Sequence, residues 1–328
     1  MLKKTLNLVS QFPAGTYVSD ETECYDEAEI EELAKVLKRL IYSPSKLRRR
    51  LQDLGVTVCP ANFYSEVPTI REIEQAAGKP PVLYDYCFDK TLMSETLEQL
   101  MPFSFEFDPP VTRPVSEGYA WNGGPFSGSD AMAYYCFIRH AKPATVLEVG
   151  SGWSTLVADA AIKANGSGRI ICIEPYPQPF LEGISNVLEV LRQPVQELDV
   201  DFFNSVLSSG DILFIDSTHT VKHGSDCIHL YLKILPAILD DILVHAHDIH
   251  LPRTVPLGNL RDLQLYWTEQ YLLYAYLLDN RRTKVLFGSA YHSTHSRNRL
   301  KDFMHQRYQE GGASLWFAQS GLRSFMKS

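Results

Sequence analysis

The sequence predicts an α/β protein: a mostly parallel, seven-stranded sheet with helices on both faces, preceded by a mainly helical N-terminal region. From residue 129 onward, short apolar segments alternate with helical patterns, and parallel strands need crossovers of this kind. The first apolar segment runs directly into a turn that contains Gly150 and Gly152. Before residue 115 this strand–turn–helix order is absent, and apolar residues recur at helical intervals instead.

The N-terminal region, residues 1–115, contains several segments with helical periodicity. The patterns predict four helices: residues 26–40, residues 45–54, a helix with Thr69 as its N-cap, and residues 92–100. Prolines and glycines between residues 109 and 128 indicate the boundary with a second domain, residues 116–328.

The second domain has the element order of a sheet covered on both faces. Its predicted strands are residues 145–150, 169–174, about 194–197, 211–216 and 241–247. Its predicted helices include residues 129–140 and a long helix over residues 260–278. Two further strands, residues 283–286 and 313–317, are expected to form an antiparallel pair that closes the sheet. We interpret the whole as a Rossmann-like fold.

The turn after the first strand is typical of a site for a nucleoside-containing ligand. Glycine lets the backbone turn sharply and approach a ligand, and the following helix directs its free N–H groups there. Glu174 follows Gly152 by 22 residues, at the end of the second strand, where a carboxylate suits the hydroxyls of a ribose. The candidate cofactor-binding residues are Glu148, Gly150, Ser151, Gly152, Ser154, Thr155 and Glu174. Asp199, after the predicted third strand, is a further candidate at the adenine edge.

Ionisable residues follow the fourth and fifth predicted strands. Asp216 and His219 come directly after the fourth strand, and His247 and Asp248 end the fifth. Because the carboxyl ends of parallel strands meet at one edge of the sheet, we expect these four side chains to converge. Two carboxylates with nearby imidazoles can bind a divalent cation or carry out acid–base chemistry.

Six short motifs occur in order between residues 60 and 290. They are Asn62-Phe63-Tyr64, residues 126–131, Glu148-Val149-Gly150-Ser151-Gly152, Ile173-Glu174-Pro175-Tyr176-Pro177, residues 214–219 and His247-Asp248-Ile249. The third resembles motif I of class I S-adenosylmethionine-dependent methyltransferases. The series is similar to a bacterial class I family related to macrocin-type and macrolide-sugar O-methyltransferases. The resemblance implies S-adenosylmethionine as cofactor and methyl transfer to a hydroxyl of a small-molecule or sugar-containing acceptor.

The same resemblance implies roles for the residues at the strand ends. Asp216 would be catalytic and bind magnesium, His219 would accept the proton of the acceptor hydroxyl, and Asp248 would be a second metal ligand. Relatives with a metal site carry an acid where this chain has His247. Imidazole suits zinc, iron or nickel better than magnesium, so the expected metal set is Asp216, His247 and Asp248 without a fixed metal identity. A metal-free acid–base site, with Asp216 orienting His219, is the other interpretation.

Two other classes of function fit parts of the sequence. Residues 245–250 superficially resemble the metal motif of metallo-β-lactamases, which would make His245, His247, Asp248 and His250 the site of a metallohydrolase. His245 lies deeper along the predicted strand, so a core position is expected for it. The third possibility is a cofactor-binding protein without catalysis. An NAD-dependent oxidoreductase ranks lower, because Thr155 replaces the third small residue of the dinucleotide motif.

Composition narrows the partners of the chain. With 328 residues and a net charge of −8, it has no excess of basic residues that would favour nucleic acid. No stretch of the sequence approaches the length of an apolar membrane span, and the six cysteines are scattered. We therefore expect a cytoplasmic enzyme with a small-molecule acceptor, in which the N-terminal region shapes the acceptor pocket or forms contacts in a homo-oligomer.

Overall fold

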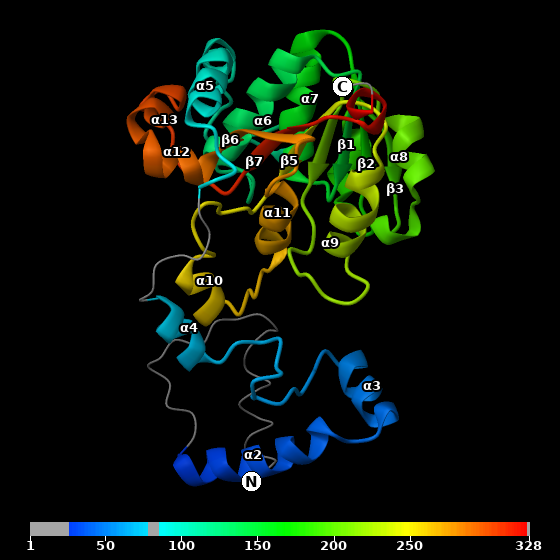
Figure 1. Ribbon diagram of the computed structural model, residues 1–328, viewed down its shortest axis with the longest axis vertical. Helices are drawn as coiled ribbons and strands as arrows, with labels where there is room; N and C mark the ends of the chain where they lie inside the picture. Colours follow the sequence, from blue (N-terminus) through cyan, green and yellow to red (C-terminus); the bar gives the residue numbers. More distant parts are fainter. Residues whose placement is uncertain (1–25, 78–84, 327–328) are drawn as a thin grey trace. The chain divides into compact units, whose positions relative to one another are not determined.

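The computed structural model describes residues 26–77 and 85–326 (Figure 1). The strands are β1 (Thr145–Val149), β2 (Arg169–Ile173), β3 (Val187–Leu191), β4 (Ile212–Ile215), β5 (Ile242–Ala246), β6 (Thr283–Gly288) and β7 (Leu315–Gln319). The helices are α2 (Glu27–Ile41), α3 (Ser45–Asp53), α4 (Ile70–Ala77), α5 (Lys90–Ser104), α6 (Gly128–Ala141), α7 (Trp153–Asn165), α8 (Val200–Val206), α9 (Asp226–His229), α10 (Leu257–Arg261), α11 (Glu269–Leu277), α12 (Ser289–His295), α13 (Arg297–Phe303) and α14 (Leu322–Phe325).

The seven strands form one sheet in the order β3-β2-β1-β4-β5-β7-β6. Neighbouring pairs from β3 to β5 are parallel, and β7 lies antiparallel between β5 and β6. This confirms the predicted Rossmann-like sheet and its antiparallel closing strand. Since β1 is adjacent to β4, which pairs with β5, the carboxyl ends of these strands meet at one edge.

The sheet buries different side chains on its two faces because successive strand residues alternate in direction. Val146 and Phe214 pack with α5, α6 and α7 in one core cluster. Leu147 and Ile215 pack with residues of α8, α9 and α11 in the other. Both clusters consist of fully or nearly fully buried apolar residues. Helices therefore cover both faces of the sheet (Figure 1).

Two predicted elements are wrong. Residues 195–197 form a 3-10 turn after Pro194, whose ring removes a backbone donor from any strand there; the third strand is β3 at the sheet edge. The predicted helix over residues 260–278 is two helices, α10 and α11. The break contains Gln264 with φ +54°, a left-handed conformation that no α-helix accommodates.

The contacts of the chain divide it into two compact units. Of the described residues, one unit contains 26–77 together with 256–266, and the other contains 85–255 and 267–326. In the first, Asp26 and Glu29 cap the start of α2 reciprocally, and Thr69 exchanges hydrogen bonds with Glu72 at the start of α4, as predicted. Among the described residues, no helix has the length and apolar character needed to cross a bilayer.

Candidate active site at the carboxyl edge of the sheet

The turn between β1 and α7 brings two strand ends together. Gly150 has φ +81°, which favours glycine, and a Cβ at this position would overlap the carbonyl oxygen of Asp216. Gly152 differs, because its φ of 177° is extended backbone and a Cβ there would meet nothing within 4 Å. Gly150 is therefore required by the close approach of β1 to the end of β4, whereas the space beside Gly152 would accept a Cβ atom.

Glu148 supports this turn from behind. Its side chain is fully buried, and it accepts hydrogen bonds from the Tyr134 hydroxyl at 2.9 Å and the Thr155 hydroxyl at 2.5 Å. The Thr155 oxygen in turn accepts from the Gly152 N–H at 3.1 Å. Burial, only partly offset by these hydroxyls, raises the pKa of Glu148 to about 7. Glu148 and Thr155 thus shape the turn, and neither lines the cleft described below.

Glu174 lies opposite the turn. Its carboxylate accepts hydrogen bonds from the Ser151 N–H at 3.2 Å and from the Tyr176 N–H at 2.8 Å. The contact across the turn fixes the acidic side chain beside the glycine loop. Asp199 has a different position, because the strand expected before it is a 3-10 turn. Its carboxylate caps α8 by accepting from the Phe202 N–H at 3.0 Å, and it does not line the cleft.

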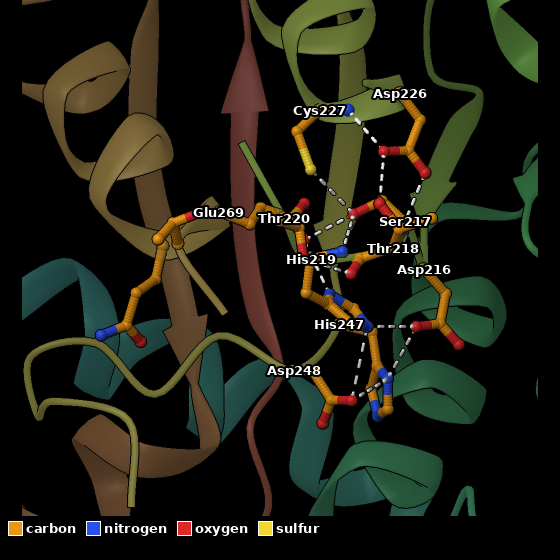
Figure 2. A network of polar contacts seen from close by, with 12 residues as sticks. Asp216, Ser217, Thr218, His219, Thr220, Asp226, Cys227, His247, Asp248 and Glu269 are labelled. Carbon is orange, nitrogen blue, oxygen red and sulfur yellow. Dashed lines mark hydrogen bonds and ion pairs between the residues drawn. The ribbon is translucent and has the colours of Figure 1, made fainter. Parts of the chain in front are cut away.

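Asp216, His219, His247 and Asp248 converge as predicted (Figure 2). The Nε2 atom of His219 lies 3.2 Å from Asp216 Oδ1 and 3.5 Å from Asp248 Oδ2. The Nδ1 atom of His247 lies 3.3 Å from the same Asp216 oxygen and 3.9 Å from Asp248 Oδ2. Both His219 and Asp248 have left-handed backbone, with φ of +57° and +56°. Such conformations are costly for residues other than glycine and concentrate at functional sites.

Each histidine has a second, buried carboxylate behind it. Glu269, at the first position of α11 and 1% exposed, lies 2.7 Å from His219 Nδ1. Asp130, in the first turn of α6, lies 3.5 Å from His247 Nε2. Neither supporting acid is among the site residues predicted from the sequence. Acidic residues are common in the first turn of a helix because they interact favourably with the helix dipole. The positions of Glu269 and Asp130 in the sequence therefore do not indicate that they also support histidines.

The charges of the group control one another's protonation. Burial opposes the charged form of His219, but hydrogen bonds with Asp216 and Glu269 outweigh it and raise the pKa of His219 to about 10. The pKa of His247 is likewise raised, because Asp216 and Asp130 overcome its burial. Burial works against ionisation of Asp216, yet the two imidazoles hold its pKa below the ordinary value. Burial raises the pKa of Asp248 despite both histidines.

Three of these residues can hold a metal ion. One ligand atom from each of Asp216, His219 and Asp248 lies within 4.8 Å of the others. Two carboxylates and one imidazole are suitable ligands for a divalent cation. This group contains His219 where the sequence interpretation placed His247. Within the described part of the chain, it is the one such group found.

The other histidines of β5 and its loop do not join the group. His245 is fully buried, stacks on Trp316 at 4.3 Å and contacts the Ser314 hydroxyl at 2.7 Å. Burial lowers its pKa well below the ordinary value, so the expected core position is confirmed. The Nε2 atom of His250 is also buried, without a hydrogen-bond partner. The metallohydrolase interpretation therefore loses His245 as a ligand.

One cleft of about 470 Å³ joins the glycine turn to the ionisable group. The predicted site residues that line it are Gly150, Ser151, Gly152, Ser154, Glu174, Asp216, His247 and Asp248. His219 is 7% exposed and lies behind Asp216 and Asp248. Phe126, in the loop before α6, forms part of the wall, and its ring lies 5.0 Å from that of His247.

Comparison with known proteins gives a match to the part of the chain that contains the glycine turn and Asp248. Residues 147–249 match the family described as methyltransferase domain. An uncharacterised protein of Archaeoglobus fulgidus is 30% identical over 187 residues, which cover 53% of this chain and 83% of that protein.

Solved structures with a partial resemblance include two methyltransferases. The O-methyltransferase TomG of Streptomyces achromogenes, in complex with S-adenosylmethionine, is 12% identical and covers 73% of this chain and 92% of its own, with a TM-score of 0.35. The plantazolicin methyltransferase BpumL is 11% identical and covers 70% and 99%, with a TM-score of 0.38. These likenesses are too distant to carry an argument about this chain.

Proposed function

The chain belongs to the same family as the Archaeoglobus fulgidus protein, and its residues 147–249 match a methyltransferase domain; from this premise we propose an S-adenosylmethionine-dependent O-methyltransferase. The acceptor is the hydroxyl of a small-molecule or sugar-containing compound. The observation that carries the proposal is the cleft that joins the glycine turn to Asp216, His247 and Asp248. A cofactor on one side and an acceptor on the other would meet there.

The cofactor is proposed to occupy the side of the cleft formed by Gly150, Ser151, Gly152 and Glu174. The glycine loop allows close approach of the ligand. The Glu174 carboxylate, which Ser151 and Tyr176 orient through their N–H groups, suits the two ribose hydroxyls. Glu148 contributes indirectly, because it holds the turn.

The acceptor hydroxyl is proposed to lie beside Asp216 and Asp248. The methyl group of a sulfonium is already reactive, so the main task of the protein is to align the acceptor oxygen. Alignment of this kind contributes up to roughly 7–11 kcal/mol in favourable systems. In a metal-free site the neutral form of His219, which a pKa of about 10 favours only at alkaline pH, would accept the proton of the hydroxyl at Nε2, the nitrogen that lies near both carboxylates. A positioned base contributes about 10²–10⁴-fold to the rate.

A divalent cation would be held by Asp216, His219 and Asp248. The chemistry it would supply is a lower pKa of the acceptor hydroxyl. His219 Nε2 can serve either as base or as ligand, but not as both at once. The two forms of the site therefore differ in whether a chelator affects activity.

The test is calorimetric titration of S-adenosylmethionine into the purified protein, with and without EDTA, and with NADH as control. Micromolar binding that NADH does not reproduce is the expected result. It is followed by a screen of hydroxyl acceptors with labelled cofactor. Absence of binding in both conditions would overturn the proposal. Binding without transfer to any acceptor would favour a non-catalytic cofactor-binding protein, and dependence of turnover on added Mg²⁺ or Zn²⁺ would identify the metal form of the site.

A further inference from the structure

The start of α11 holds the backbone of His219. The N–H groups of Thr268 and Glu269 both donate to the His219 carbonyl oxygen, at 2.8 and 3.0 Å. The Thr268 hydroxyl also accepts from the Val221 N–H at 2.8 Å. These contacts hold the chain at His219, which has left-handed backbone, and just after it. The loop after β4 and the start of α11 therefore act as one support for the imidazole.

The Glu269 side chain then fixes the imidazole itself. Its Oε2 atom lies 2.7 Å from His219 Nδ1 and accepts from the Ser217 hydroxyl at 2.6 Å. Its Oε1 atom accepts from the Tyr231 hydroxyl at 2.6 Å. A carboxylate that receives three donors only accepts hydrogen bonds, so Nδ1 of His219 carries a proton. The other ring nitrogen, Nε2, is then the one presented to Asp216 and Asp248 (Figure 2).

A role for Glu269 in capping α11 does not account for this geometry. A capping side chain accepts from backbone N–H groups of the first helical turn. The hydrogen bonds described for the Glu269 carboxylate go instead to the side chains of Ser217, His219 and Tyr231. Burying a carboxylate at 1% exposure is costly without such partners. The carboxylate is thus directed at the loop that carries the site.

We propose that Glu269 is a positioning residue for methyl transfer: it fixes the tautomer and orientation of His219 so that Nε2 faces the cleft-side carboxylates. The inference rests on the proposed function, because positioning matters only if His219 acts in the reaction. It holds whether Nε2 accepts a proton or binds a cation, since both require the lone pair of that atom. Loss of a carboxylate that orients a histidine in this way typically costs 10–100-fold in activity or metal affinity.

The test compares Glu269→Gln with Tyr231→Phe. Glutamine has the size of glutamate but brings an N–H₂ group among three donors. We expect Glu269→Gln to lower kcat by about 10–100-fold, to change the pH profile of kcat, and to leave the Kd of S-adenosylmethionine unchanged. Tyr231→Phe removes a hydroxyl from Oε1 and leaves the Oε2 contact with His219 Nδ1, so it should lower kcat less and keep the pH profile. Equal effects on kcat with unchanged pH profiles would indicate a structural role only.

A spectroscopic measurement decides the tautomer without any assay of activity. In protein labelled with ¹⁵N-histidine and studied above the pKa of His219, where the imidazole is neutral, the His219 signal, assigned by its loss in His219→Asn, should show a protonated Nδ1 and an unprotonated Nε2 in the wild type. Addition of Mg²⁺ should leave Nδ1 protonated. A wild-type Nδ1 without a proton would overturn the proposal even if Glu269→Gln fails to fold. If wild type neither binds cofactor nor transfers methyl, the proposed function has failed, and the role of Glu269 in methyl transfer fails with it. A protonated Nδ1 with full wild-type activity and an unaffected Glu269→Gln enzyme would overturn the positioning role alone.

Discussion

The two sides of the cleft, which we propose to hold the cofactor and the acceptor and call the cofactor half and the acceptor half, are built in different ways. The cofactor half consists of a glycine turn and Glu174, which lie within one β-α-β segment and contact each other through backbone N–H groups. The acceptor half consists of side chains whose supports lie far along the chain, since Glu269 is 50 residues from His219. The shape of the first half therefore follows from local backbone geometry, and that of the second from packing of helices against the sheet.

The same difference appears in the buried carboxylates. Glu148, in the cofactor half, has hydroxyl partners, and burial raises its pKa to about 7. Asp130, in the acceptor half, is also deeply buried, but the neighbouring His247 and other donors hold its pKa below the ordinary value. A hydroxyl compensates only part of the cost of burying a charge, whereas an imidazolium compensates most of it. Glu148 is therefore partly protonated near pH 7, whereas Asp130 is held as an anion in a network of paired charges.

Gly150→Ala should damage both halves, because this residue is where they meet. Its left-handed backbone disfavours alanine, and the new Cβ would overlap the Asp216 carbonyl oxygen. We expect the free energy of unfolding to fall by about 2–5 kcal/mol and cofactor binding to be lost. Gly152→Ala is the matched control, since its Cβ would meet nothing within 4 Å. Denaturant unfolding of both variants checks this; equal stabilities would show that the close approach at Gly150 is not needed.

His219→Ala should separate the halves by affecting the acceptor half alone. We expect kcat to fall by about 10²–10⁴-fold, with the Kd of S-adenosylmethionine unchanged, because His219 does not line the cofactor side of the cleft. Turnover and calorimetry on the same preparation provide the measurement. His223→Ala, an exposed histidine in the following loop, should retain full activity. Loss of cofactor binding with unchanged turnover of the remaining complex would contradict the assignment.

Glu174→Ala should have the opposite effect. Hydrogen bonds to a charged group contribute about 1.5–3 kcal/mol each, so we expect the Kd of S-adenosylmethionine to rise by about 10–100-fold with kcat at saturation nearly unchanged. Glu189→Ala, on the exposed side of the edge strand β3, is the control. If kcat fell and Kd did not change, Glu174 would belong to the acceptor half.

The raised pKa of Glu148 predicts a pH dependence of stability between about pH 4.5 and pH 7. Its pKa rises from the usual 4.5 to about 7 on folding, so between these values the folded state holds a proton that the unfolded state has released. The free energy of unfolding contributed by this group therefore falls as pH rises from about 4.5 to about 7. Glu148→Gln, which cannot ionise, should remove this slope and stabilise the protein by about 1–3 kcal/mol at pH 8. Urea unfolding at pH 5 and pH 8 measures both; an unchanged slope in the variant would show that Glu148 is not its source.

Most of the sheet and part of the site could be predicted from the sequence. The strands inside the sheet are covered on both faces, so their sequences are continuous apolar runs bounded by turn residues. This pattern made it possible to predict β1, β2, β4 and β5. β3 was displaced in the prediction because an edge strand with exposed Leu188 and Glu189 lacks that continuous apolar pattern. The helix over residues 260–278 was predicted as continuous because apolar periodicity persists through a segment that tertiary structure breaks at Gln264.

The sequence by itself determined the glycine turn, the position of Glu174 beside it and the gathering of Asp216, His219, His247 and Asp248. These follow from backbone conformation and strand direction, which are local properties. Only the tertiary structure decided which carboxylate stands behind each histidine, that Glu148 faces away from the cleft, and that His219 lies at metal-ligand spacing from Asp216 and Asp248. Such pairings depend on contacts between helices and strands distant along the chain, and no local pattern of residues encodes them.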